Sequence, residues 1–221
     1  MCANYEAPRQ PELHFSMHPP PFEYLNELYP AMFGPILLQH PEHADELQAV
    51  RVMFGMVPHW ANLSLARQTY NARSETVAQK PTFRDAWRKR RFCLIPVDHF
   101  YEPCYETGKA VRWSIHRKDG KPFALAGIWE VCQSKDPDKD PMPLRSFSML
   151  TINATDHPLM KRFHRPEDEK RSVVVIEPED YFAWLNAEDD KQARAYLRLM
   201  SVEEFTASPA PKVRAASATP K

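Results

Sequence analysis

The apolar positions along this chain come in short runs, and most of these runs have the length and composition of strands. They are rich in Val, Ile, Leu and Phe, and polar or proline-containing segments separate them, which is typical of strands rather than helices. The dipeptide Asp119-Gly120 between two of the runs is a strong signal for a hairpin turn. Strands are therefore predicted at residues 49–57, 92–97, 111–117, 122–132, 147–153 and 173–176.

Helical periodicity is confined to a few short segments. Thr82-Phe83-Arg84-Asp85 has the form of a capping box and predicts a short helix through Arg90. Residues 179–186 and 189–200 each place apolar side chains on one face at helical spacing. Many strands and few helices predict the α+β class. We expect a single domain with a curved antiparallel sheet or barrel-like core and peripheral helices.

The polar segments indicate where the folded domain ends. Residues 133–143 are polar and broken by prolines, so an exposed loop is expected there. After Phe205 the sequence TASPAPKVRAASATPK contains no aromatic residue, and residues 206–221 are expected to form a disordered tail. The predicted domain therefore spans residues 2–205.

Composition limits the classes of function. With 29 Lys and Arg against 29 Asp and Glu, the net charge of zero excludes a polycation that coats duplex DNA, so any contact with nucleic acid must use a local basic patch. No segment approaches the roughly 18 apolar residues of a membrane span, and the N-terminus lacks the pattern of an export signal. We therefore expect a cytoplasmic protein that contacts no membrane.

The cysteines and histidines do not predict a bound metal. The four cysteines lie far apart without a C-x-x-C pair, and no histidine has the spacing of a metal ligand. The chain has 22 prolines but only 5 glycines, and it lacks a glycine-rich phosphate loop. Free thiols, stiff loops and the absence of any metal or cofactor are the expectation.

Cys2 directly follows the initiator methionine. Because cysteine is small, Met1 is expected to be removed, which would leave an α-amine and a thiol on adjacent carbons. The amine, with an ordinary pKa of about 7.7–8.0, is partly neutral near pH 7. Such a residue can form an imine with an aldehyde and then close a thiazolidine ring through its thiol. Position alone favours the alternative that Cys2 is a tolerated small residue on a frayed terminus.

Residues 70–76 (YNARSET) concentrate polar chemistry in one loop. The Asn71 amide can both donate and accept hydrogen bonds, so it can orient an amine or a carbonyl. The Arg73 guanidinium matches the geometry of a phosphate. The alternative is a solvated turn with an Arg–Glu pair, and on this segment alone it is the better interpretation.

Two further residues are candidates for proton transfer. Glu102 follows an apolar strand and stands between aromatic residues and a proline, where a carboxyl group can act as a proton shuttle; an exposed edge glutamate is an equally good interpretation. His164 lies in a segment with five cations between residues 161 and 171, which would suit a base beside an anionic ligand. The alternative is a solvated basic loop balanced by the acidic residues 167–169.

Three segments taken together resemble the SRAP (SOS-response-associated peptidase) family: Met1-Cys2, YNARSETVAQKPTFRDAWRKRRFCLIPVDHFYE and LTINATDHPLMKRFH. The likeness extends from residue 2 to about residue 185. It implies a single α+β domain with a barrel-like antiparallel core that crosslinks to abasic sites in single-stranded DNA during the response to DNA damage. By this resemblance Cys2 forms the crosslink, Asn71 positions its amine, Glu102 acts as acid and base, and His164 assists opening of the sugar and proton transfer.

The resemblance also implies a DNA-binding groove lined by Arg73, Trp60, Thr151 and an arginine that follows His164. Trp60 would stack against DNA beside the lesion. Arg165 and Arg171 are rivals for the last position, and Arg171 is preferred because Ser172-Val173 leads directly into a strand. The implied partner is single-stranded DNA containing abasic sites. We expect a monomer that associates with the nucleoid when bound to DNA.

The chain departs from the family pattern in three places. Ala3-Asn4 follow Cys2 where Gly-Arg is usual, so a cationic contact near the nucleophile is expected to be missing. Pro103 follows Glu102 where Trp is usual, which changes the wall beside the carboxylate. A short insertion follows His164.

Two other functions remain open at this stage. In the first, the protein is a thiol autopeptidase in which Cys2 is the nucleophile, His164 its base and Asn71 the orienting residue. In the second, it is a non-catalytic single-strand binding module that uses the basic run 84–91 with Trp87.

Overall fold

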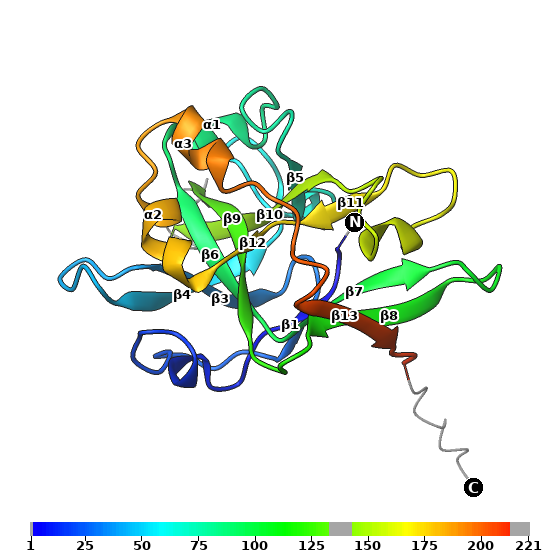
Figure 1. Ribbon diagram of the computed structural model, residues 1–221. Helices are drawn as coiled ribbons and strands as arrows, with labels where there is room; N and C mark the ends of the chain where they lie inside the picture. Colours follow the sequence, from blue (N-terminus) through cyan, green and yellow to red (C-terminus); the bar gives the residue numbers. More distant parts are fainter. Residues whose placement is uncertain (1, 133–142, 213–221) are drawn as a thin grey trace, which may run out of the picture.

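Strands that are distant in sequence close into a barrel at the centre of the molecule (Figure 1). The computed structural model describes residues 2–132 and 143–212. In this part of the chain, five strands pair in a ring in the order β4, β3, β6, β9, β10, and β10 pairs back onto β4. They are β3 (Phe33–Gln39), β4 (Leu47–Phe54), β6 (Phe92–Val97), β9 (Phe123–Cys132) and β10 (Leu144–Asn153). Only the β10–β4 pairing in this ring is parallel. Ring closure removes the exposed edges of an open sheet.

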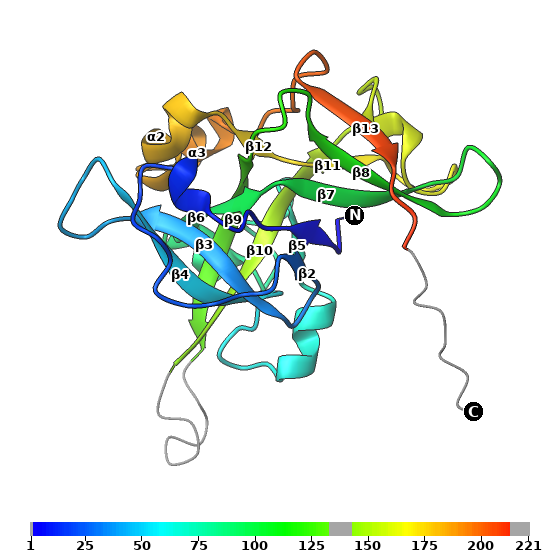
Figure 2. The same cartoon turned by 90° about the horizontal axis from the view of Figure 1, so that it is seen from below.

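A second, antiparallel sheet lies beside the barrel (Figure 2). Its order is β13 (Phe205–Pro209), β8 (Val111–Arg117), β7 (His99–Cys104), β1 (Tyr5–Glu6) and β2 (Glu27–Leu28). Asp98 alone separates β6 from β7, so the chain passes directly from the barrel into this sheet. Tyr5 pairs with Phe100, which places the start of the chain beside β7.

Three short strands extend the barrel: β5 (Asn71–Arg73), β11 (Arg171–Val173) and β12 (Val175–Ile176). Arg73 pairs with Thr151, and Arg171 pairs with Asn153, so β5 and β11 both lie against the last residues of β10. Two segments that are distant in sequence, β5 and β11, therefore meet at one end of β10.

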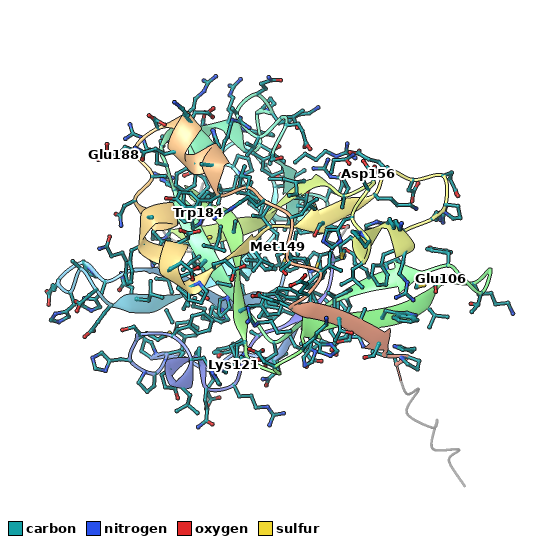
Figure 3. All side chains as sticks on the ribbon, in the orientation of Figure 1. Glu106, Lys121, Met149, Asp156, Trp184 and Glu188 are labelled. Carbon is teal, nitrogen blue, oxygen red and sulfur yellow. The ribbon has the colours of Figure 1, made fainter. Side chains whose placement is uncertain are left out.

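The strand β6 shows how the interior is divided. Cys93 and Ile95 belong to a cluster inside the barrel and beside the second sheet, whereas Phe92 and Leu94 belong to a cluster between the barrel and the helices. Because neighbouring strand residues point to opposite faces, a continuous apolar run is needed to bury both. Trp184 is fully buried beneath the helices, and Glu188 lies at the outer surface (Figure 3).

The described helices are short: η1 (Pro11–Leu13), η2 (Leu63–Arg67), α1 (Arg84–Arg88), η3 (Met160–Arg162), η4 (Pro178–Asp180), α2 (Tyr181–Leu185) and α3 (Asp190–Ala195). Many strands and few helices confirm the predicted α+β class with a barrel-like core. No described helix is both long enough and apolar enough to cross a bilayer.

Details of the predicted helices and strands differ. The capping box at Thr82 does not form, because the amides of Phe83 and Arg84 already bond to the Lys80 carbonyl. The helix predicted at 189–200 ends at Ala195, since Met200 must reach the barrel cluster while Ala193 packs in the other one.

The strand predicted at 49–57 ends at Phe54, and Gly55 follows with a φ of 106°. A side chain at Gly55 would come within 2.0 Å of the Ala66 carbonyl oxygen, so this turn requires glycine.

The prediction that the tail becomes disordered from residue 206 is wrong for its first residues. Thr206–Pro209 continue β13, which pairs with β8, and the Ala210 amide bonds to the Arg112 carbonyl. Phe205 anchors this strand with its ring against that of Phe123, at a centroid distance of 5.0 Å. Backbone pairing needs no apolar side chains, so composition did not reveal it. The domain therefore continues past residue 205. Residues 213–221, and most of the predicted loop 133–143, lie outside the described residues.

Candidate active site

Cys2 is buried beside β7, with 1% of its surface exposed. The Tyr101 amide donates to the Asn4 carbonyl over 3.0 Å, and β1 then continues the pairing with β7. The Cys2 thiol lies 3.5 Å from the same Asn4 carbonyl. This backbone pairing excludes the interpretation of Cys2 as a residue on a frayed terminus.

Asn71 reaches Cys2 from β5. Its amide nitrogen Nδ2 donates to the Cys2 carbonyl over 3.0 Å. Its other amide atom, Oδ1, is buried without a hydrogen-bond partner among the described residues. Ala72 packs in the helix-side cluster, so alternation along the strand places Asn71 and Arg73 on the opposite face. The side chain is thus fixed by its strand, and one acceptor is left over.

Glu102 and His164 meet next to this thiol. Glu102 lies on β7 and is 3% exposed, and its Oε2 lies 3.0 Å from His164 Nε2. His164 has a φ of 66°, which is uncommon for a residue other than glycine. Its amide donates to the Pro103 carbonyl over 2.9 Å, and Phe163 bridges to Cys104. Pro103, the residue that departs from the family pattern, therefore helps to hold the histidine.

The His164 ring keeps unused hydrogen-bonding capacity. Its Nδ1 is buried without a hydrogen-bond partner among the described residues. Its Nε2 instead lies 3.0 Å from Glu102 Oε2. Nδ1 is therefore available to exchange a proton with a bound molecule.

Burial and charge set the state of the thiol. Burial, and secondarily the charge of Glu102, raises the pKa of Cys2 from 9.0 to about 12, so the sulfur is protonated near neutral pH. Burial also raises the pKa of the half-buried Tyr70, with further contributions from Glu102 and Cys2. Tyr70 is thus a neighbour of the site that sequence reasoning missed. The available signal was its position next to Asn71.

A second polar cluster lies further along β5 and involves three of the predicted DNA-binding residues. Arg171 is 2% exposed and donates to both carboxylate oxygens of Glu75, over 2.9 and 2.8 Å. It also donates to Glu169 over 2.8 Å and to the Thr151 carbonyl over 2.7 Å. The partly exposed Arg73 pairs with Glu169 over 2.7 Å. Protein acceptors therefore already engage both guanidinium groups.

Trp60 and Arg165 lie on the surface. Trp60 is 50% exposed in the segment between β4 and η2. Arg165 is exposed, and a hydrogen bond that it donates to Tyr105, together with nearby acidic charges, raises its pKa. No hydrogen bond or ion pair among the described residues joins either one to Cys2. Their role in binding DNA stays a prediction.

A cation from another strand contacts Asn4, two residues after Cys2. Arg112 on β8 donates to Asn4 Oδ1 over 3.1 and 2.8 Å, and its guanidinium lies over the Tyr101 ring. Glu27 balances its charge at 2.6 Å. The sequence could not reveal this contact, because it depends on the pairing of β7 with β8.

The four residues predicted to carry the chemistry come together. Cys2 and Asn71 share a hydrogen bond, Glu102 and His164 are in contact, and the charge of Glu102 acts on the Cys2 thiol. Among the described residues, no group of three or more His, Cys, Asp or Glu side chains could hold a metal ion. The arrangement offers a buried nucleophile, an orienting amide and an acid–base pair.

Curated proteins similar to this chain share one description. The chain is 29% identical over 138 residues to the abasic site processing protein YoqW of Bacillus subtilis, an alignment that covers 62% of this chain and 56% of that protein. It is 23% identical over 154 residues to the abasic site processing protein HMCES of Gallus gallus, covering 58% and 45%. The chain thus spans about half the length of the curated relatives it matches.

Solved structures support the fold, and a family model identifies the domain. A crystal structure of a protein from Bordetella bronchiseptica has a TM-score of 0.86 and 32% identity, covering 96% of this chain and 100% of that one. One from Bacteroides thetaiotaomicron, at 22% identity, has a TM-score of 0.67 and covers 86% and 79%. The model of the SOS response associated peptidase (SRAP) family matches residues 3–214. The chain therefore belongs to the SRAP family.

Proposed function

We propose that this protein processes abasic sites in single-stranded DNA by forming a covalent thiazolidine crosslink through Cys2, after Met1 has been removed. The main support is the placement of a buried Cys2 against Asn71 and the Glu102–His164 pair. The names of the curated relatives point to the same substrate.

The first step is opening of the sugar. An abasic deoxyribose is mostly a closed hemiacetal, so its aldehyde must be exposed before an amine can attack. One member of the Glu102–His164 pair removes the proton of the anomeric hydroxyl while the other protonates the ring oxygen. The bond between C1 and the ring oxygen breaks, which gives an aldehyde at C1 and a free hydroxyl. The separation of 3.0 Å between the two side chains suits a pair that exchanges one proton.

The Cys2 amine then attacks the aldehyde carbon, and water leaves as the imine forms. With the pKa of the thiol at about 12, sulfur is the weaker nucleophile at this stage, which favours attack by the amine first. The unpartnered Oδ1 of Asn71 can accept a hydrogen bond from this amine. The thiol next adds to the imine carbon, and its proton ends on the nitrogen. One aldehyde and one aminothiol thus give one thiazolidine and one water.

DNA binding completes the proposal. A strand that delivers its abasic sugar to Cys2 would pass the face of β5 that carries Arg73, with Thr151 on the neighbouring strand. Trp60 is exposed and can stack on a base. Arg165, which is exposed, and Arg171, which is buried among protein acceptors, both stay candidates for contact with a phosphate.

The intact mass of the protein after mixing with an oligonucleotide that bears one abasic site tests this function. The expected product is the chain without Met1 plus the oligonucleotide minus one water. Cys2→Ala keeps an amine but no thiol, so it should lose the stable adduct and retain strand nicking by β-elimination. A non-cleavable extension before Cys2 should abolish both activities. Normal crosslinking by the extended protein would contradict the proposal.

The same mixture distinguishes the alternatives. A thiol autopeptidase would use Cys2 as a thiolate, which the raised pKa disfavours; cleavage of a test peptide without any DNA adduct would support it. A non-covalent binding module would leave no complex on a denaturing gel.

A further inference from the structure

The carboxylate of Glu169 occupies a site built for an anion. Its Oε2 accepts from Arg73 over 2.7 Å, and its Oε1 accepts from Arg171 over 2.8 Å and from the Asn153 amide over 3.1 Å. Three donors from β5, β10 and β11 thus converge on two oxygens. A phosphate group presents oxygens that would fit the same donors.

Two of the three donors, Asn153 and Arg171, are held in place by groups other than Glu169. The Asn153 Oδ1 accepts from the Thr155 amide over 3.0 Å, which fixes the direction of its NH₂ group. Glu75 and the Thr151 carbonyl hold Arg171 over 2.7 to 2.9 Å. These two donors therefore keep their positions when Glu169 leaves, and the partly exposed Arg73 is released to bind the incoming group.

Glu169 is free to leave. Its side chain is 36% exposed, and it lies in the segment between His164 and β11, outside any strand. An ion pair this exposed contributes little to stability. With Glu169 in place, the charges of Arg73, Arg171, Glu75 and Glu169 sum to zero. Without it the sum is +1, which matches one phosphate of a DNA backbone.

The site lies next to the residues that we propose carry out the crosslinking reaction. Arg73 is two residues from Asn71 on the same face of β5, about 7 Å along the strand, and Glu169 is five residues after His164. We propose that Glu169 is an internal competitor for DNA, whose carboxylate occupies the phosphate site formed by Arg73, Asn153 and Arg171 until a backbone phosphate displaces it. This inference rests on the proposed function and adds to it a residue that weakens binding to undamaged strands.

Binding of a fluorescent oligonucleotide without an abasic site tests the proposal, because no crosslink can form. Glu169→Gln should tighten binding about three- to tenfold. The slope of log affinity against log salt should steepen by about 0.7, the value for one further phosphate contact on a single strand. Glu42→Gln, the same charge change on the exposed segment between β3 and β4, should alter affinity less than twofold.

A double variant shows whether the tighter binding of the oligonucleotide by Glu169→Gln arises at this phosphate site. Adding Arg73→Ala to Glu169→Gln should remove most of the gain, because Arg73 is the donor that Glu169 releases. The inference is overturned if Glu169→Gln binds no tighter than Glu42→Gln, or if neither protein binds detectably, while thermal unfolding shows both folded. A failure to crosslink abasic DNA alongside the expected gain would overturn the proposed function only. Normal crosslinking without the gain would overturn this inference only.

Discussion

Two polar clusters lie two residues apart on β5, and they differ in how their polar atoms are satisfied. Around Asn71, two buried atoms, its Oδ1 and the Nδ1 of His164, have no partner among the described residues. Around Arg171, two carboxylates, a carbonyl and a hydroxyl accept from a single guanidinium. An unsatisfied buried polar atom costs about 1–3 kcal/mol. The first cluster is therefore the more costly to the fold, although the Nε of Arg171 in the second is also buried without a partner among the described residues.

The difference suits the cluster around Asn71 to a chemical reaction and the cluster around Arg171 to the binding of an anion. Atoms without partners are retained where a substrate would satisfy them, and the uncommon φ of His164 is retained at the same place. In the cluster around Arg171, Glu75 and Glu169 instead neutralise the charges of the arginines, so an incoming phosphate must compete with a carboxylate. Changes in the first cluster should therefore act on chemistry, and changes in the second on stability and affinity.

The largest expected effect concerns the Cys2 thiol. Because its pKa is raised from 9.0 to about 12, the reactive thiolate at pH 8 is about a thousandfold rarer in the folded protein than in the unfolded one. Alkylation by iodoacetamide, followed at Cys2 by peptide mass, should slow by at least this factor relative to the protein in urea. Equal rates in the two states would show that the thiol is neither buried nor desolvated.

The raised pKa of Cys2 also makes the free energy of unfolding depend on pH. The pKa is higher in the folded state than in the unfolded state, so the folded state favours the neutral thiol. Its contribution is complete below pH 9 and is lost as the pH rises from 9 towards 12. The unfolding free energy of Cys2→Ala should therefore fall less steeply over this range than that of the unmodified chain.

The next effect concerns proton transfer. Glu102→Gln keeps the shape of the side chain but removes its proton-accepting charge, and we expect crosslinking to slow about a hundredfold. Gel time courses with excess abasic oligonucleotide measure the rate. Glu42→Gln, on the exposed segment between β3 and β4, changes the same charge away from the cluster and should alter the rate less than twofold. Comparable slowing by both variants would assign the effect to net charge and not to the Glu102–His164 pair.

The sequence predicted the chemistry better than the strand pairing. Asn71, Glu102 and His164 could be selected because their side chains suit amine orientation and proton transfer, and the family resemblance joined them to Cys2. Two of the strands that bring them together, β1 and β5, have only two and three residues, too few for a period to be visible. The strand β3 was missed because Gly34 and Pro35 interrupt its apolar run.

Contacts between strands were beyond the reach of sequence reasoning. Arg112 meets Asn4 only through the pairing of β8, β7 and β1, and Glu169 meets Arg73 only through β5, β10 and β11. Long-range pairing sets such contacts, and no local signal marks them. Arg171 was chosen over Arg165 for its place before a strand, and that place is also what buries it among carboxylates.

The smallest expected effect concerns the cluster around Arg171. Arg171→Ala leaves Glu75, Glu169 and the Thr151 carbonyl without their shared donor. Breaking a buried ion pair costs about 3–5 kcal/mol. Since the Glu75 side chain is 48% exposed and water can reach it, we expect a loss of about 2 kcal/mol in the free energy of unfolding, measured by urea denaturation.

A comparison of the variants within this cluster shows which side chains support the fold. Glu169→Gln removes an exposed partner from the same guanidinium and should change stability by less than about 0.5 kcal/mol, because Glu75 continues to hold Arg171 through two hydrogen bonds. Arg171→Lys should fall between the two, since an ammonium cannot pair with both Glu75 oxygens in the same geometry. If Glu169→Gln proved as costly as Arg171→Ala, Glu169 would be a structural support of β11. A phosphate could then not displace it without loosening the end of β10 that places Asn71 against Cys2.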